Sequence, residues 1–149
     1  MSPARRRLAW SLPGILLAGA LGTLLLLLWV SSALAARAFD SGDLGGAEAS
    51  YDRQRAVTRL WPEPWKAPYN LGTARLAQGE YEGAVEPLRD ALARVPTAVA
   101  DEEGRLDPAS AECRVRSNLA GALEGVAAGA GDEQAAASAR AEAADVIAP

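Results

Sequence analysis

The sequence lacks histidine altogether and contains a single cysteine in 149 residues. Without an imidazole, the chain cannot form the Ser-His-Asp or Cys-His arrangements that activate nucleophiles. One cysteine excludes a disulfide within the chain, and it leaves too few ligands for the usual zinc sites of several His and Cys residues. We therefore expect no catalytic residues of these classes, and neither a cofactor nor a metal ion.

Positive charge is also scarce. The 15 lysine and arginine residues are outnumbered by 19 aspartate and glutamate residues, so the formal net charge is -4 at pH 7. Proteins that bind nucleic acid nonspecifically carry a basic surface. No nucleic-acid partner is therefore expected, and the length predicts one main domain.

The longest run without a charged residue covers residues 8–36 and is rich in leucine. Only about 20 apolar residues are needed to cross the hydrocarbon core of a bilayer, where a helix satisfies its own backbone polar groups. We predict a basic N-terminal segment at residues 1–11 and a transmembrane helix at residues 12–35 that contacts the lipid bilayer. Trp10 and Trp29 are candidates for its two interfaces.

The two flanks of this run differ in charge. Three arginines, Arg5 to Arg7, precede it, whereas the segment from Arg37 to Asp43 holds one arginine and two aspartates. The positive-inside rule then predicts a single pass with the N-terminus in the cytoplasm and residues 36–149 outside. Ala33-Leu34-Ala35 also fits a signal-peptide cleavage motif. An uncleaved signal anchor and a cleaved signal peptide both remain open, and both export the same domain.

Residues 65–98 carry a pattern of small and apolar residues that predicts two antiparallel helices. Gly72 and Ala84 lack bulky side chains, so two helix backbones can approach closely. Gly79 favours the left-handed conformation that ends a helix, and Pro96 stops the second helix. This 34-residue pattern resembles a tetratricopeptide repeat. The resemblance implies that the repeat packs through Leu71, Gly72, Ala74, Gly79, Tyr81, Ala84, Leu88, Ala91 and Pro96.

Two residues depart from the repeat pattern. Arg75 stands where a large apolar or aromatic residue is usual. Pro87 lies inside the expected second helix, where it removes a hydrogen bond and is expected to kink the helix.

An upstream copy is detectable over residues 28–61. Gly42 takes the position of Gly79 in this copy, after allowance for an insertion in the linker 61–64. The first helix of this copy is therefore expected to begin inside the apolar run.

A downstream copy spans residues 110–147 and follows an acidic insertion near residues 98–107. We expect a small-residue turn from Gly125 to Gly131, and a final helix at residues 133–147 capped by Asp132. The chain is thus expected to be all-α. An N-terminal transmembrane helix is followed by a short TPR-like array of antiparallel helical hairpins over residues 36–149.

Two pairs of polar residues mark a candidate groove. Lys66 and Asn70 are four residues apart, as are Arg114 and Asn118, so each pair presents a cation and an amide on one helix face. Tetratricopeptide arrays often bind peptides in a groove lined by first helices, and one type holds a carboxylate with such residues at these two repeat positions. The resemblance therefore implies partner binding by Lys66, Asn70, Arg114 and Asn118. Pro68 is expected to leave Lys66 just before the helix.

Other polar and aromatic groups have plainer interpretations. Asp101, Glu102, Glu103 and Asp107 lack calcium-loop spacing and are expected to form a solvated loop. Cys113 is expected to be a small buried core residue. The aromatic residues of the first two repeats are expected either to pack between repeats or to form a docking surface, and they are Tyr51, Trp61, Trp65, Tyr69 and Tyr81.

The anchor, the repeats and the segment from Cys113 to Glu124 together resemble small membrane tetratricopeptide proteins of bacteria, some of which are encoded beside MoxR-type ATPases and von Willebrand factor A domain proteins. The resemblance implies a scaffold in the bacterial cytoplasmic membrane that binds other envelope proteins and has no catalytic role. Self-association or a partner is expected to complete so short an array. The alternatives are an exported soluble adaptor released near Ala35, and a carboxylate-dependent hydrolase using Glu80, Glu82 and Glu86.

Overall fold

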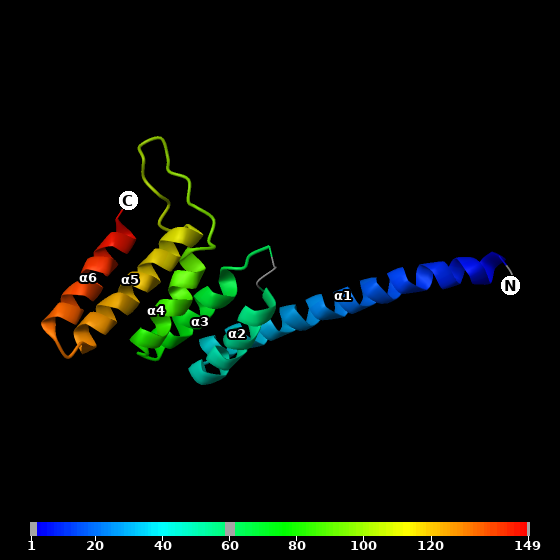
Figure 1. Ribbon diagram of the computed structural model, residues 1–149, viewed down its shortest axis with the longest axis horizontal. Coiled ribbons are helices and arrows are strands. Elements are labelled where there is room, and N and C mark those ends of the chain that lie inside the picture. Colours follow the sequence, from blue (N-terminus) through cyan, green and yellow to red (C-terminus); the bar gives the residue numbers. More distant parts are fainter. Residues whose placement is uncertain (1–2, 59–61, 149) are drawn as a thin grey trace. The chain divides into compact units, whose positions relative to one another are not determined.

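A computed structural model describes residues 3–58 and 62–148, and side-chain surroundings from Leu12 onward. This part of the chain is all-helical. Its helices are α1 (Pro3–Asp40), α2 (Leu44–Thr58), α3 (Lys66–Ala77), α4 (Tyr81–Leu92), α5 (Ala111–Gly129) and α6 (Glu133–Ile147) (Figure 1). The chain divides into two compact units, residues 1–34 and 35–149.

Helix α1 is long and apolar enough to span a membrane from Leu12 to Asp40, and the most apolar part of this segment is not buried inside the protein. Large apolar side chains such as Leu17 and Trp29 are exposed along it, which suits a lipid environment. The helix exceeds the predicted span of residues 12–35 at both ends. The predicted orientation in the membrane stays a prediction.

The last turns of α1 belong to the second unit and take part in its core. Ala35 is only 1% exposed and forms one buried cluster with Ala47 and Tyr51 of α2 and with Leu71 and Ala74 of α3. The end of the apolar run therefore contributes a buried residue to the second unit, and the start of an upstream copy there stays a prediction.

Helices α1 and α3 end in the same way. Gly42 and Gly79 adopt φ angles of +83° and +77°, which a glycine accepts without strain. After α3, the Gly79 amide donates to the Leu76 carbonyl and the Glu80 amide to the Arg75 carbonyl, and the corresponding bonds form around Gly42. This is the Schellman pattern of helix ends. The predicted helix end at Gly79 is confirmed, and its equivalence to Gly42 extends to backbone geometry.

Gly72 lies at a close approach of α3 and α4. A Cβ atom at this position would lie 2.5 Å from Leu88 Cγ and 3.2 Å from the Ala84 carbonyl oxygen. Leu88, Ala84 and Ala91 are fully buried on the facing side of α4. The predicted close approach of the two helices is confirmed.

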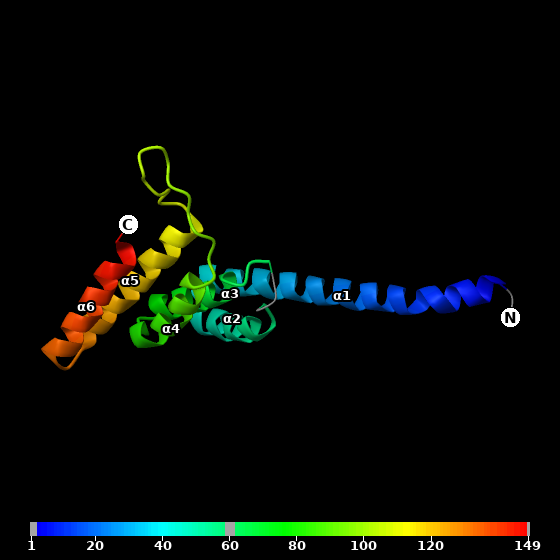
Figure 2. The same cartoon turned by 45° about the horizontal axis from the view of Figure 1, so that its top comes forward.

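In the second unit each helix contacts the next one along the chain, from α2 to α6, and α3 also contacts α5 (Figures 1 and 2). Trp65 forms a buried cluster with Ala91 of α4 and Val115 of α5. The largest apolar cluster lies among α4, α5 and α6. The core of the unit therefore consists of three apolar clusters, which lie along successive helices.

The expected turn from Gly125 to Gly131 is wrong, because α5 continues through Gly129. The ring of Tyr81 lies directly against Gly125, and a side chain at that position would collide with it. Gly125 thus serves close packing between α4 and α5 and does not break the helix. The final helix begins at Glu133 as predicted, and the Asp132 carboxylate accepts a hydrogen bond of 2.8 Å from the Ala135 amide.

Candidate functional site

A side-chain hydrogen bond joins α3 and α5. Asn118 Nδ2 on α5 donates to Thr73 Oγ1 on α3 over 2.9 Å. The Thr73 hydroxyl in turn donates to the Tyr69 carbonyl over 2.8 Å. Sequence reasoning selected Asn118 as a partner-binding residue, but the structure uses its amide to hold α5 against α3. Thr73 was not foreseen, because only its contact with α5 distinguishes it.

Two further candidate residues lie beside this junction. Asn70 is one turn before Thr73 on α3, and Arg114 is one turn before Asn118 on α5, so each shares a helix face with a residue of the bonded pair. Arg114 is exposed and Asn70 is half-buried. Within the described part of the chain, neither side chain makes an ion pair or hydrogen bond. Their polar groups are available to a ligand.

Lys66 is placed differently from the prediction. It is the first residue of α3 and does not precede the helix, because a proline in the first turn, here Pro68, removes an amide that has no partner within the helix. Lys66 Nζ lies 2.6 Å from Glu63 Oε2 and 5.9 Å from the centre of the Trp65 ring. Its charge is thus already paired with the linker before α3.

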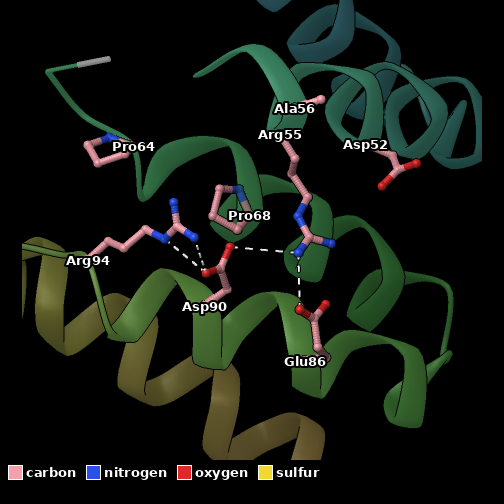
Figure 3. Close-up of a pocket in the computed structure, with 8 residues that line it drawn as sticks. All are labelled: Asp52, Arg55, Ala56, Pro64, Pro68, Glu86, Asp90 and Arg94. Carbon is pink, nitrogen blue, oxygen red and sulfur yellow. Dashed lines mark hydrogen bonds and ion pairs between the residues drawn. The ribbon is translucent and has the colours of Figure 1, made fainter. Parts of the chain in front are cut away.

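A polar pocket of about 440 Å³ lies between α2, α4 and the start of α3 (Figure 3). Arg55 of α2 reaches across to α4, where its Nη2 lies 3.1 Å from Glu86 Oε1 and 3.7 Å from Asp90 Oδ2. Arg94 Nη2 lies 2.6 Å from Asp90 Oδ1. The residues that line the pocket are Asp52, Arg55, Ala56, Pro64, Pro68, Glu86, Asp90 and Arg94.

Sequence reasoning did not identify this pocket. The sequence indicates it only through the spacing of charged residues. Asp52 and Arg55 are three residues apart on α2, and Glu86 and Asp90 are four apart on α4, so each pair lies on one face of its helix. The spacing does not reveal that the two faces meet, since that depends on the packing of α2 and α4 against α3.

The acidic insertion is an ordered turn that projects between α4 and α5 (Figure 1). Asp101 Oδ1 accepts backbone hydrogen bonds from Arg105 over 2.7 Å and from Glu103 over 3.1 Å. The backbone bond from Arg105 is the main cause that lowers the pKa of the Asp101 carboxyl. The loop is exposed, as expected. The Asp101 carboxylate is already used by hydrogen bonds within the turn.

A buried carboxylate holds the base of this loop to α5. Glu112 Oε2 accepts a 2.7 Å hydrogen bond from the Ala98 amide, and Glu112 Oε1 lies 2.7 Å from Arg116 Nη2. The bond from Ala98, followed by the Arg116 contact, lowers the pKa of the Glu112 carboxyl. Arg116 Nη1 also donates to the Val146 carbonyl at the end of α6 over 2.7 Å. One ion pair therefore joins the loop, α5 and the end of α6.

Cys113 is half-buried, so the expectation of a small buried core residue is wrong. It lies on the side of α5 that faces a second pocket of about 390 Å³, which it lines together with Leu106 and Ile147. The inserted loop and the end of α6 approach α5 there without covering the thiol completely.

The three glutamates of the hydrolase hypothesis do not share a pocket. Glu80 and Glu82 line a hollow beside Tyr81, whereas Glu86 lines the polar pocket between α2 and α4 and pairs with Arg55. All three are exposed.

The aromatic residues serve packing to different degrees. Tyr51 and Trp65 are buried. The Trp65 and Tyr69 rings lie 5.8 Å apart between centroids. Tyr81 is 41% exposed although its ring touches Gly125, and Trp61 lies outside the described residues.

No family model, no curated protein sequence and no solved structure matches the chain at a significant level.

Proposed function

We propose that the chain is a membrane-anchored scaffold of the tetratricopeptide type, which binds other proteins of a bacterial cell envelope through its helical unit. The all-helical fold and the long apolar α1 support this proposal. Attachment to a membrane raises the local concentration of the helical unit relative to partners in the same membrane.

Two features support a repeat array. The same helix end recurs at Gly42 and Gly79, and α3 contacts both α4 and α5. In stacked hairpins, the first helix of one hairpin packs on its own second helix and lies beside the first helix of the next. Helices α1, α3 and α5 then act as first helices, and α2, α4 and α6 as second helices.

Burial of Ala35 favours an uncleaved anchor over a released adaptor. Cleavage after Ala33-Leu34-Ala35 would remove Ala35 from the cluster that it forms with Ala47 and Leu71. Loss of a buried residue leaves a cavity, which costs stability. The buried cluster of the helical unit therefore keeps all of its residues only when α1 stays attached.

The junction of α3 with α5 is the observation that carries the binding proposal. The Asn118–Thr73 hydrogen bond brings together the helix faces that present Asn70 and Arg114. An amide and a guanidinium without partners in the described structure suit the backbone carbonyls or carboxylates of an extended peptide. Lys66 contributes only if a ligand displaces Glu63 from its ammonium group.

Affinity capture of the full chain from its own membranes tests this function. We expect the amount of co-purified partner protein to fall severalfold when Asn70 and Arg114 are both replaced by alanine. The matched control replaces Gln134 and Arg140, an amide and a guanidinium on the exposed side of α6, and should retain the partners. Binding at the α3–α5 face would be refuted if both variants lost partner proteins to the same extent, or if neither variant lost any.

A further inference from the structure

Among the residues that the structure describes, the polar pocket between α2 and α4 has more negative than positive groups. Three carboxylates line this described part, from Asp52, Glu86 and Asp90, against the two guanidinium groups of Arg55 and Arg94. Both guanidinium groups are already paired with carboxylates within the pocket. An anionic ligand would have to displace these pairs, whereas a cation would not.

The surplus acceptor oxygens lie on both helices. Asp90 uses both of its oxygens, Oδ1 for Arg94 and Oδ2 for Arg55, while Glu86 uses only Oε1 for Arg55. Asp52 makes no ion pair or hydrogen bond within the described part of the chain. Glu86 Oε2 and both oxygens of Asp52 are therefore open to a donor. Figure 3 shows these two residues on α2 and α4, the helices that form opposite walls of the pocket.

The other described residues of the lining are apolar. Ala56, Pro64 and Pro68 supply hydrocarbon surface without any side-chain charge. A long cationic side chain has the matching composition, since its methylene stem packs on apolar surface while its head group reaches the carboxylates. Arginine suits the pocket best, because its planar guanidinium donates several hydrogen bonds in a fixed geometry.

We propose that this pocket receives an arginine side chain of a partner polypeptide. The site lies apart from the α3–α5 face, and it deepens the proposed function because it names the chemistry of a second partner contact. Charge complementarity selects the occupant: a partner segment that carries arginine without neighbouring acidic residues.

The test is a titration of the isotope-labelled full chain, held in uncharged detergent micelles, with two capped peptides. One is acetyl-Ala-Arg-Ala-amide, and the other carries citrulline, the neutral isostere of arginine. With the arginine peptide, we expect saturable changes in the NMR chemical shifts of the backbone amides near Asp52 and Glu86. Affinity should fall about threefold with citrulline, the loss expected for one partly exposed ion pair.

Two variants separate a specific pocket from general attraction. Asp52→Asn removes a carboxylate that makes no hydrogen bond or ion pair in the described part of the chain, and it should lower the affinity for the arginine peptide about threefold. Glu124→Gln removes the same charge from an exposed position on α5 and should leave the affinity unchanged. Equal affinity for both peptides, equal effects of the two variants, or no saturable shifts would overturn the proposal. None of these outcomes bears on capture through Asn70 and Arg114, so failure of the pocket and failure of the proposed function are distinguishable.

Discussion

Arg75 supplies the hydrogen bond that Pro87 cannot make. In a regular helix the amide of residue 87 would donate to the carbonyl of Gly83, but proline has no amide hydrogen. Arg75 Nη1 on α3 donates to this Gly83 carbonyl over 3.0 Å, and α4 continues through Pro87 to Leu92. The two residues that depart from the repeat pattern thus compensate for each other.

This relationship predicts a coupling between the two positions. Arg75 Nε also lies 2.8 Å from Glu48 Oε1 of α2. Arg75→Ala should lower the free energy of unfolding by about 1 kcal/mol, because it removes the charged hydrogen bond to Gly83 and this ion pair. In a Pro87→Ala background, the new amide of residue 87 donates to the Gly83 carbonyl itself. Arg75→Ala should then lower the free energy of unfolding by measurably less than it does in the parent chain. Denaturant unfolding of the four chains completes the double-mutant cycle. Additive costs would show that the two residues are independent.

Close packing at Gly72 predicts a large effect of one methyl group. Gly72→Ala should destabilise the protein by about 2 kcal/mol, since its Cβ would overlap Leu88. Gly121→Ala is the control, because a Cβ at this position on α5 meets no atom within 4 Å. That substitution should be neutral or raise stability by about 0.5 kcal/mol through helix propensity. Thermal unfolding of both variants measures the difference, and similar midpoints would contradict the close approach of α3 and α4.

The Glu112 carboxylate predicts a loss of stability in acid. Its folded-state pKa lies below the ordinary value of 4.5, so folding favours the ionised form and releases protons. The stabilisation is complete above the ordinary pKa and is lost as the pH falls through 4.5 toward the lowered pKa. Glu112→Gln should be less stable than the parent at neutral pH.

The same variant should show a weaker decline of unfolding free energy from about pH 5 to pH 3. Glu124→Gln, at an exposed position, should follow the parent over this range. If the Glu112→Gln chain declines as steeply as the parent, the contacts with Ala98 and Arg116 do not control the acid response.

Local features of this fold were predictable from the sequence, and features that depend on three-dimensional contact were not. The helix ends at Gly79 and the final cap at Asp132 depend on residues within one turn, which a sequence pattern reports directly. The Asn118–Thr73 bond and the Glu112 ion pair join segments far apart in the chain. No spacing rule predicts such partners before the helices are placed.

The misplaced turn at Gly125 has a related cause. A run of glycine and alanine favours a break when each residue is considered alone, but the Tyr81 ring needs a position without a side chain on α5. Tertiary packing therefore requires a glycine at position 125, in the interior of α5. Sequence alone cannot distinguish this use of glycine from a turn.

Burial of Ala35 predicts the mass of the mature chain. The N-terminal segment should remain attached, so intact-mass spectrometry of the protein from native membranes should show α1 still present. Extraction with alkaline carbonate should leave the protein in the membrane pellet. A mature chain that begins at Ala36 in the soluble fraction would establish the released adaptor in its place.

Photo-crosslinking from the α3–α5 face tests the central claim most directly. A photoreactive amino acid replaces Arg114 in one chain and Arg140 of α6 in another, and both chains are irradiated in their own membranes. A scaffold that binds proteins through this face should give discrete crosslinked partners from position 114 and few or none from position 140. The same products from both positions, or no product from position 114, would contradict the account.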